Sequence, residues 1–366
     1  MAVSKIRLRS LWFSVHKWIG ILLAILIIPV SLSGSALVWH EWLDETLNPE
    51  RVVESGPAEL PYETYIAAAR TQLGPQDRIA SIALPDGEGA VVVAAARAPE
   101  GGGGRALRTT IWLDPADARL LDRHSGNEGA VRFLHVLHGS LMVPGMGRQI
   151  VGWIGAFMLV SSLTGLWLWW PNLGGFRRGL RWRRQDTTNA NLHHSVGFWI
   201  CLPLAILSFT GVWISFPGVF GGGAPAAAAA AKAPAGPPLP LQETRLGPDV
   251  AAAFAVVASR REPAMVTWPT NRSPQWTIVV RGEGGGAEYK IDDTSGEAQP
   301  QPVRPETLAR SMRRWHDGDG MGPVWQVVIF AGGIAPALLA VTGIVMWLRT
   351  RKWRRKAAAN RQTAAA

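Results

Sequence analysis

The chain has 366 residues, 48% of them hydrophobic, and a formal net charge of +10. Its apolar residues gather in four uncharged runs, at 18–39, 149–175, 195–222 and 323–348. Each run is long enough to cross a hydrocarbon layer about 30 Å thick, which takes about 20 helical residues. None alternates with a period of two, so the runs predict membrane helices rather than barrel strands. This excludes an ordinary soluble protein.

The placement of charge predicts the topology and argues against a nucleic-acid partner. The segments before the first run, between the second and third, and after the fourth carry 16 basic residues and one acidic residue, Asp186. The long loops at 41–147 and 218–322 have net charges of −6 and zero. Excess Lys and Arg marks the cytoplasmic side of a membrane. We therefore expect a multi-pass protein in contact with lipid, with both termini cytoplasmic and both long loops outside.

The four apolar runs and the two long loops predict a mainly α membrane protein. We expect a four-transmembrane-helix bundle of two tandem helix pairs, with two small α+β extracytoplasmic modules. In chain order we expect a cytoplasmic tail (1–17), helix one (18–40), outer module one (41–147), helix two (148–171), a basic cytoplasmic loop (172–193), helix three (194–217), a tether with outer module two (218–322), helix four (323–348) and a basic cytoplasmic tail (349–366). The single cysteine, Cys201, excludes a disulfide within the chain.

Turn signals and apolar patterns divide the two modules into short elements. In the first module they predict a helix at 62–72, strands at 78–84, 90–96 and 109–113, and a helix at 130–142 with His135, His138 and Met142 on one face. In the second they predict a low-complexity tether at 221–240, a helix at 249–260, strands at 275–281 and 287–291, and a helix at 305–315.

The two halves of the chain repeat each other. Histidines, glycines and one arginine recur at shifts of 177 or 178 residues: His16 and His193, Gly34 and Gly211, Arg132 and Arg310, His138 and His316, Gly165 and Gly343. So many matches in nearly one register indicate an internal duplication. The register also separates His193 from its neighbour His194, and His138 from the nearby His135.

Four histidines at repeat-matched positions predict two facing pairs, His16 with His193 and His138 with His316. Two imidazoles that face each other across an apolar slot suit a haem iron with both axial positions filled. The chain lacks the Cys-x-x-Cys-His motif of covalent c-type haem. The pattern therefore predicts two bis-histidine b-type haems, one near each side of the membrane. The glycines, Gly20 and Gly197 included, either let a flat macrocycle approach the backbone or let helices pack closely.

Other uses of these side chains remain open. A zinc site usually adds Cys, Asp or Glu to histidine at short spacing, and the four runs contain no carboxylate. His194 and His135 are alternative ligands, and His135 with His138 is an alternative metal face. His40 and His124 lack a repeat counterpart and are interpreted as surface residues. Arg132 and Arg310 either pair with haem propionates or an anionic substrate, or are solvated.

Several stretches resemble one membrane family. HKWIG at 16–20, LHGSL at 137–141, SLTGLWLWWP at 162–171 and LHHSVGFW at 192–199 resemble the PepSY-associated transmembrane proteins, which include iron-regulated inner-membrane proteins and ferric-siderophore reductases. The resemblance implies a bacterial inner-membrane location, PepSY-like outer modules and two haems. It marks His16, His193, His138 and His316 as ligands. The fused flavin domain of some members has no counterpart here.

The leading functional hypothesis is electron transfer across the membrane. A quinol or a cytoplasmic reductase would supply the electrons, and a ferric chelate or siderophore outside would accept them, which makes the protein an oxidoreductase. A haem-free anchor whose modules bind or inhibit an extracytoplasmic partner is one alternative. A small-solute permease is another, because duplicated repeats are common in transporters.

Overall fold

A computed structural model describes most of the chain. The described residues are 5–53, 55–99, 106–125, 129–170, 176–181, 185–220, 239–240, 263–281, 287–292, 295, 297–302 and 306–365. They fall into two compact units. We call them the helix unit (Met1–His40, Phe133–Pro225 and Glu306–Ala366) and the sheet unit (Glu41–Arg132 and Ala226–Pro305).

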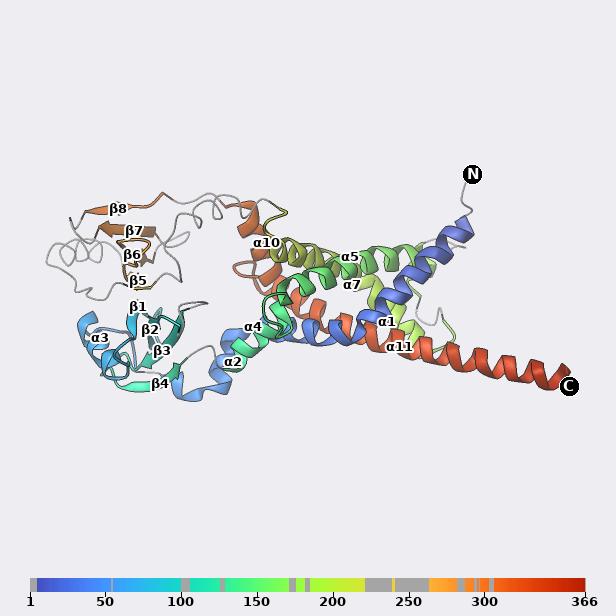
Figure 1. The fold of residues 1–366 in the computed structure, drawn as a ribbon, viewed down its shortest axis with the longest axis horizontal. Helices are drawn as coiled ribbons and strands as arrows, with labels where there is room; N and C mark the ends of the chain where they lie inside the picture. Colours follow the sequence, from blue (N-terminus) through green and yellow to red (C-terminus); the bar gives the residue numbers. More distant parts are fainter. Residues whose placement is uncertain are drawn as a thin grey trace. The chain divides into compact units, whose positions relative to one another are not determined.

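Four long helices form the helix unit: α1 (Lys5–Leu37), α5 (Gly147–Trp169), α7 (Thr188–Ser215) and α11 (Pro323–Ala365) (Figure 1). All four are long and apolar enough to cross a membrane. Both α1 and α7 pack against α5 and α11, which places α1 and α7 diagonally across the bundle. Large apolar side chains such as Leu22, Ile25 and Trp199 are exposed on its outside. Such a surface is stable only against lipid, so the chain is a multi-pass membrane protein.

The membrane helices are longer than the apolar runs that predict them. Helix α1 already begins at Lys5, inside the expected tail at 1–17, and α11 continues through the expected tail at 349–366 as far as Ala365. Lys and Arg are good helix formers, so charge ends a membrane span without ending the helix. Helix α7 begins at Thr188, where the side chain of Thr187 accepts a hydrogen bond from the backbone N–H of Ala190. His16 and His193 therefore lie inside helices α1 and α7, not in the tail at 1–17 and the loop at 172–193 that the sequence predicts.

Shorter helices connect these spans: α2 (His40–Leu47), the 3₁₀ helix η1 (Pro49–Arg51), α4 (Ala130–Ser140), α6 (Phe176–Gly179) and α10 (Leu308–Asp317). The prediction that Met142 shares a helical face with His135 and His138 is wrong. Helix α4 ends at Ser140, and Leu141 and Met142 have positive φ angles, as the chain turns through Pro144 towards α5.

The sheet unit contains one eight-stranded antiparallel sheet in the order β4-β3-β2-β1-β5-β6-β7-β8. The strands are β1 (Arg78–Ala83), β2 (Val91–Arg97), β3 (Leu107–Leu113), β4 (Leu120–Ser125), β5 (Pro263–Thr267), β6 (Gln275–Val280), β7 (Ala287–Asp292) and β8 (Ala298–Pro300), and helix α3 (Tyr62–Thr71) packs on β2 and β3. The two modules share this sheet, because β1 pairs with β5. The strand order is mirrored about that junction, as a two-fold repeat requires.

Five of these strands match the predicted ones, and β4, β5 and β8 were not predicted. The missed strands lack clear apolar alternation: β4 reads LLDRHS and β8 has three residues. The predicted helix at 249–260, and the predicted tether as far as residue 238, lie outside the described residues.

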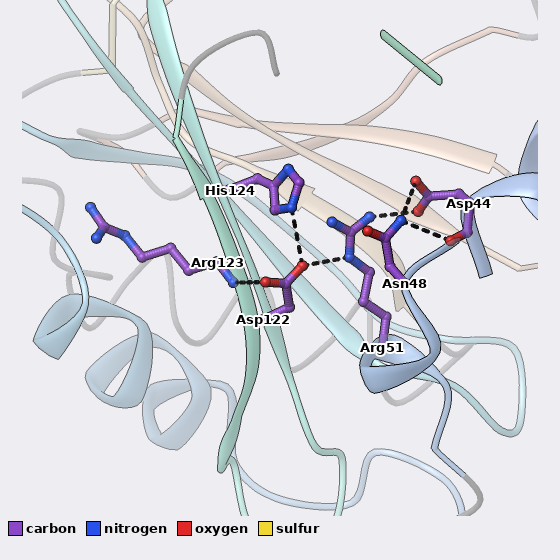
Figure 2. A network of polar contacts seen from close by, with 6 residues as sticks. All are labelled: Asp44, Asn48, Arg51, Asp122, Arg123 and His124. Carbon is purple, nitrogen blue, oxygen red and sulfur yellow. Dashed lines mark hydrogen bonds and ion pairs between the residues drawn. The ribbon is translucent and has the colours of Figure 1, made fainter. Parts of the chain in front are cut away.

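The buried side chain of Arg51 connects helix α2, at the start of the sheet unit, to strand β4 (Figure 2). Arg51 is 8% exposed. Its Nη1 donates to Asp44 Oδ2 at 2.7 Å, and its Nε donates to Asp122 Oδ2 at 2.7 Å. Its guanidinium also lies 3.8 Å from the ring centroid of Trp112, a cation–π contact. One planar side chain thus joins α2, η1, β3 and β4.

Replacing Arg51 with Ala should destabilise the folded protein by about 3 kcal/mol, because the carboxylate of Asp122, whose side chain is only 18% exposed, loses the guanidinium that pairs with it. The free energy of unfolding of the purified full-length chain measures this. Arg123→Ala is the matched control: Arg123 is exposed, and its contact with Asp122 comes from its backbone N–H at 2.7 Å, which alanine keeps. An equal loss in both variants would contradict the assignment.

Asp114, in the turn after β3, should make a pH-dependent contribution to the stability of the protein. The backbone N–H of Ala116, and then Ser55 and Arg119, hold the pKa of Asp114 below its ordinary value against the opposing effect of burial. A lowered folded-state pKa stabilises the protein above the unfolded-state pKa, and this stability is lost as pH falls through the folded-state pKa. Asp114→Asn should therefore lower the melting temperature at pH 7 and change it much less near pH 3. An equal loss at both pH values would refute this.

Candidate functional site

Two histidines from different halves of the chain meet near one end of the bundle. His16 lies on α1 and His193 on α7, and their ring centroids are 6.4 Å apart with the ring planes nearly perpendicular, at 86°. We call them the first histidine pair. Because α1 and α7 are diagonal in the bundle, the two rings reach towards each other across its axis.

A second histidine pair lies near the opposite ends of α1 and α7. His138 on α4 and His316 on α10 have ring centroids 5.9 Å apart. Each precedes a membrane helix by a short turn, His138 before α5 and His316 before α11. Gly318, with a φ of 81°, caps α10 in the left-handed conformation, so the helix ends at Asp317, one residue after His316. All four predicted histidines therefore lie in the two predicted combinations.

Each of the four rings lies against a glycine of another helix. A Cβ added to Gly34 would come within 2.6 Å of the His138 ring, and one added to Gly211 within 3.1 Å of the His316 ring. For the first pair, a Cβ on Gly165 would lie 3.1 Å from the His16 ring and one on Gly343 would lie 3.5 Å from the His193 ring. We call Gly34, Gly165, Gly211 and Gly343 the glycine seats.

The glycine seats add a contact that the sequence analysis did not predict. An imidazole ring from another helix lies against each of these four glycines. Gly20 differs, because nothing lies within 4 Å of a Cβ built there, and Gly197 meets only Leu339, at 3.8 Å. A Cβ at Gly20 would therefore contact no other described group.

Carbonyl groups four residues before the seats orient the rings. The Nδ1 of His138 lies 2.8 Å from the carbonyl oxygen of Val30, and that of His316 lies 3.1 Å from the carbonyl of Leu207. The Nδ1 of His16 is likewise 3.1 Å from the carbonyl of Ser161. A carbonyl oxygen only accepts, so Nδ1 carries the proton and donates. The other nitrogen, Nε2, then keeps its lone pair for a ligand bond.

Hydroxyl groups one residue before the seats add a second partner. Thr210 Oγ1 lies 3.0 Å from Nδ1 of His316, Thr164 Oγ1 lies 3.3 Å from Nδ1 of His16, and Thr342 Oγ1 lies 2.9 Å from Nδ1 of His193. The three hydroxyls donate to carbonyls of their own helices and accept from the histidines. The sequence analysis missed these threonines, although the repeated Ser/Thr-Gly dipeptide is visible in SLSG, SLTG, SFTG and AVTG.

Burial keeps the second pair neutral. It lowers the pKa of His316 to about 3 and also lowers the pKa of His138, whose bond to the Val30 carbonyl acts in the opposite direction. Both imidazoles are therefore uncharged at neutral pH. An uncharged imidazole is the form that binds a metal.

The remaining sequence candidates lie outside the pairs. His194 contacts the ring of His193 edge-on at 6.3 Å, and His135 faces His40 at 6.1 Å. The Nε of Arg132 is buried without a hydrogen-bond partner, whereas Arg310 is exposed. His124 contacts Asp122 at 3.4 Å and the ring of Trp112 in the sheet unit.

The spacing within each pair fits two ligands on one metal ion. A bond from a metal to an imidazole nitrogen is about 2 Å long, and two such bonds on opposite sides of one ion place the ring centroids about 6 Å apart. The observed separations are 6.4 and 5.9 Å. Among the described residues no group of three or more His, Cys, Asp or Glu could hold a metal ion. Each pair thus offers two facing imidazoles at a separation that fits two nitrogen ligands of one metal ion.

Gly34→Ala should displace the His138 ring and lower the melting temperature of the purified protein, because the added Cβ would lie 2.6 Å from that ring. Gly139→Ala is the matched control, since nothing lies within 4 Å of a Cβ built at Gly139 in α4. We expect the control to keep or slightly raise the melting temperature, as alanine favours a helix. Equal melting temperatures for Gly34→Ala and the unmodified protein would contradict the seat.

Comparison with known sequences identifies the family. A search of curated proteins found no match. The profile of the family described as "PepSY-associated TM region" matches residues 13–350, which include both histidine pairs, all four glycine seats and every membrane helix at least in part. The resemblance inferred from HKWIG, LHGSL and their counterparts is thereby confirmed. The chain belongs to the PepSY-associated transmembrane family.

Proposed function

We propose that the protein carries electrons across the bacterial inner membrane through two b-type haems, one on each histidine pair. The observation that supports this most directly is the spacing of the pairs: four histidines from distant parts of the chain form two sets of rings 6.4 and 5.9 Å apart. In each pair the Nδ1 atoms donate hydrogen bonds, so both Nε2 atoms keep a lone pair that can bind a metal ion.

The residues present fit a haem with two axial ligands. His16 and His193 would hold one haem, and His138 and His316 would hold the other. A bound haem would supply a one-electron couple, and two filled axial positions disfavour oxygen binding. The chain supplies orientation: the glycine seats fix the planes of the imidazoles, and the carbonyl and hydroxyl partners raise the basicity of the ligand nitrogens.

Both sites share the same two helices. Gly34, the seat of His138, lies 18 residues after His16 on α1, and Gly211 lies 18 residues after His193 on α7. At 1.5 Å per residue, 18 residues span about 27 Å, which is close to the thickness of the hydrocarbon layer. A carrier at each end of this span would connect the two faces of the membrane.

The direction of transfer follows from the predicted topology. Basic residues flank the end of the bundle that holds the first pair, so this pair would accept electrons from a quinol or a cytoplasmic reductase. The second pair would deliver them to a periplasmic acceptor. A ferric chelate or ferric siderophore is the proposed acceptor, as the resemblance of the sequence to a family that includes ferric-siderophore reductases implies.

A visible spectrum of the purified protein tests the proposal. The reduced protein should show a b-type Soret band with two haems per chain. His16→Ala and His316→Ala should each lose one haem, because one axial ligand and its hydrogen bonds disappear. His194→Ala is the matched control: its ring touches that of His193, but it belongs to neither pair, so both haems should remain.

Colourless protein, or an unchanged haem content in His16→Ala and His316→Ala, would refute the proposal and favour the haem-free anchor. Vesicle assays would then define the reaction. Ferric-chelate reduction should depend on all four histidines, and quinol and NADPH compared as donors would show which reductant supplies the electrons.

A further inference from the structure

A third pair of histidines, not used by the proposed electron path, lies in the helix unit. His40 begins α2 and His135 lies in the middle of α4, and their ring centroids are 6.1 Å apart, at an interplanar angle of 82°. This separation falls between those of the first and second pairs. Both His40 and His135 are exposed, whereas the members of the first and second pairs are partly buried.

The ring of His40 is oriented as a metal ligand is. Its Nδ1 lies 3.2 Å from the carbonyl oxygen of Leu37, which can only accept. The proton is therefore on Nδ1, and Nε2 keeps its lone pair. A metal-binding histidine usually makes this kind of bond through its other nitrogen.

The surroundings differ from those of a haem slot. No glycine seat lies against His40 or His135, since the described glycines that meet a histidine ring meet His16, His124, His138, His193 or His316. Both rings are exposed, so a bound ion can complete its coordination with water. Two imidazoles with open coordination positions suit a small metal ion.

This pair also departs from the duplication. At the positions matching His40 and His135, the second half has Pro217 and Arg313. Neither residue binds a metal ion. The first and second pairs need matching histidines in both halves, so His40 and His135 do not follow from that requirement and form a feature of the first half alone.

We propose that His40 and His135 form a binding site for a divalent transition-metal ion that prefers imidazole, of which Cu²⁺ binds most tightly. The two histidines supply two ligands, and water or the donors of an incoming chelate complete the coordination. His135 precedes His138 by three residues on α4, so the bound ion lies beside the second histidine pair. Binding at this site does not depend on the proposed electron transfer.

Copper binding to the full-length, detergent-solubilised protein tests the site. The protein is purified with an affinity tag that lacks histidine, oxidised, and titrated with Cu²⁺ alone in the absence of any reductant. We expect one Cu²⁺ per chain, with electron paramagnetic resonance showing two imidazole nitrogens. His40→Ala and His135→Ala should each weaken the affinity about tenfold or more and leave one imidazole nitrogen in the copper signal.

His124→Ala is the matched control, because His124 is a histidine of the sheet unit that contacts Asp122 and Trp112. Its copper affinity should equal that of the unmodified protein. Unchanged affinity in both His40→Ala and His135→Ala, or an equal loss in His124→Ala, would overturn the proposal. Haem content is recorded in the same samples, so a colourless protein that binds copper would refute only the electron-transfer proposal.

Discussion

Contact between an imidazole ring and the backbone of a neighbouring helix is the constraint on which the helix unit depends. Only glycine leaves room for a ring at that distance, and the helix that carries the glycine also supplies the carbonyl that receives the Nδ1 proton. Packing and hydrogen bonding thus fix the same side chain from one surface. Because the seat and the carbonyl are four residues apart, one turn of helix is enough to position each ligand.

The duplication explains why these contacts come in sets of four. A two-fold arrangement of the halves brings α1 opposite α7, so each pair joins equivalent histidines of the two halves, with ring separations of 6.4 and 5.9 Å. The sheet unit follows the same rule, since β1 and β5 pair at the centre and the remaining strands follow in mirrored order. Each unit is therefore built from two copies that complete one another.

The sequence predicted the membrane helices, the histidine pairs and five of the strands, because each leaves a local signal: uncharged length, repeat register or apolar alternation. It did not predict that Gly34 and Gly211 receive imidazole rings, since the sequence shows which residues repeat but not which ones touch. It also missed that His40 faces His135, a contact between residues far apart in the chain and without repeat counterparts. Strands β4 and β5 depend on pairing partners more than on their own composition.

The glycine seats act within one half of the chain, whereas the histidine pairs join the two halves, and this difference has an evolutionary consequence. Every ring sits on a glycine of its own half: His16 on Gly165, His138 on Gly34, His193 on Gly343 and His316 on Gly211. Every pair, by contrast, joins one histidine from each half. A half-length ancestor could thus orient its histidines unaided but would have formed a pair only as a homodimer. Once two copies are fused, positions such as Pro217 and Arg313 can differ from His40 and His135 while both pairs are kept.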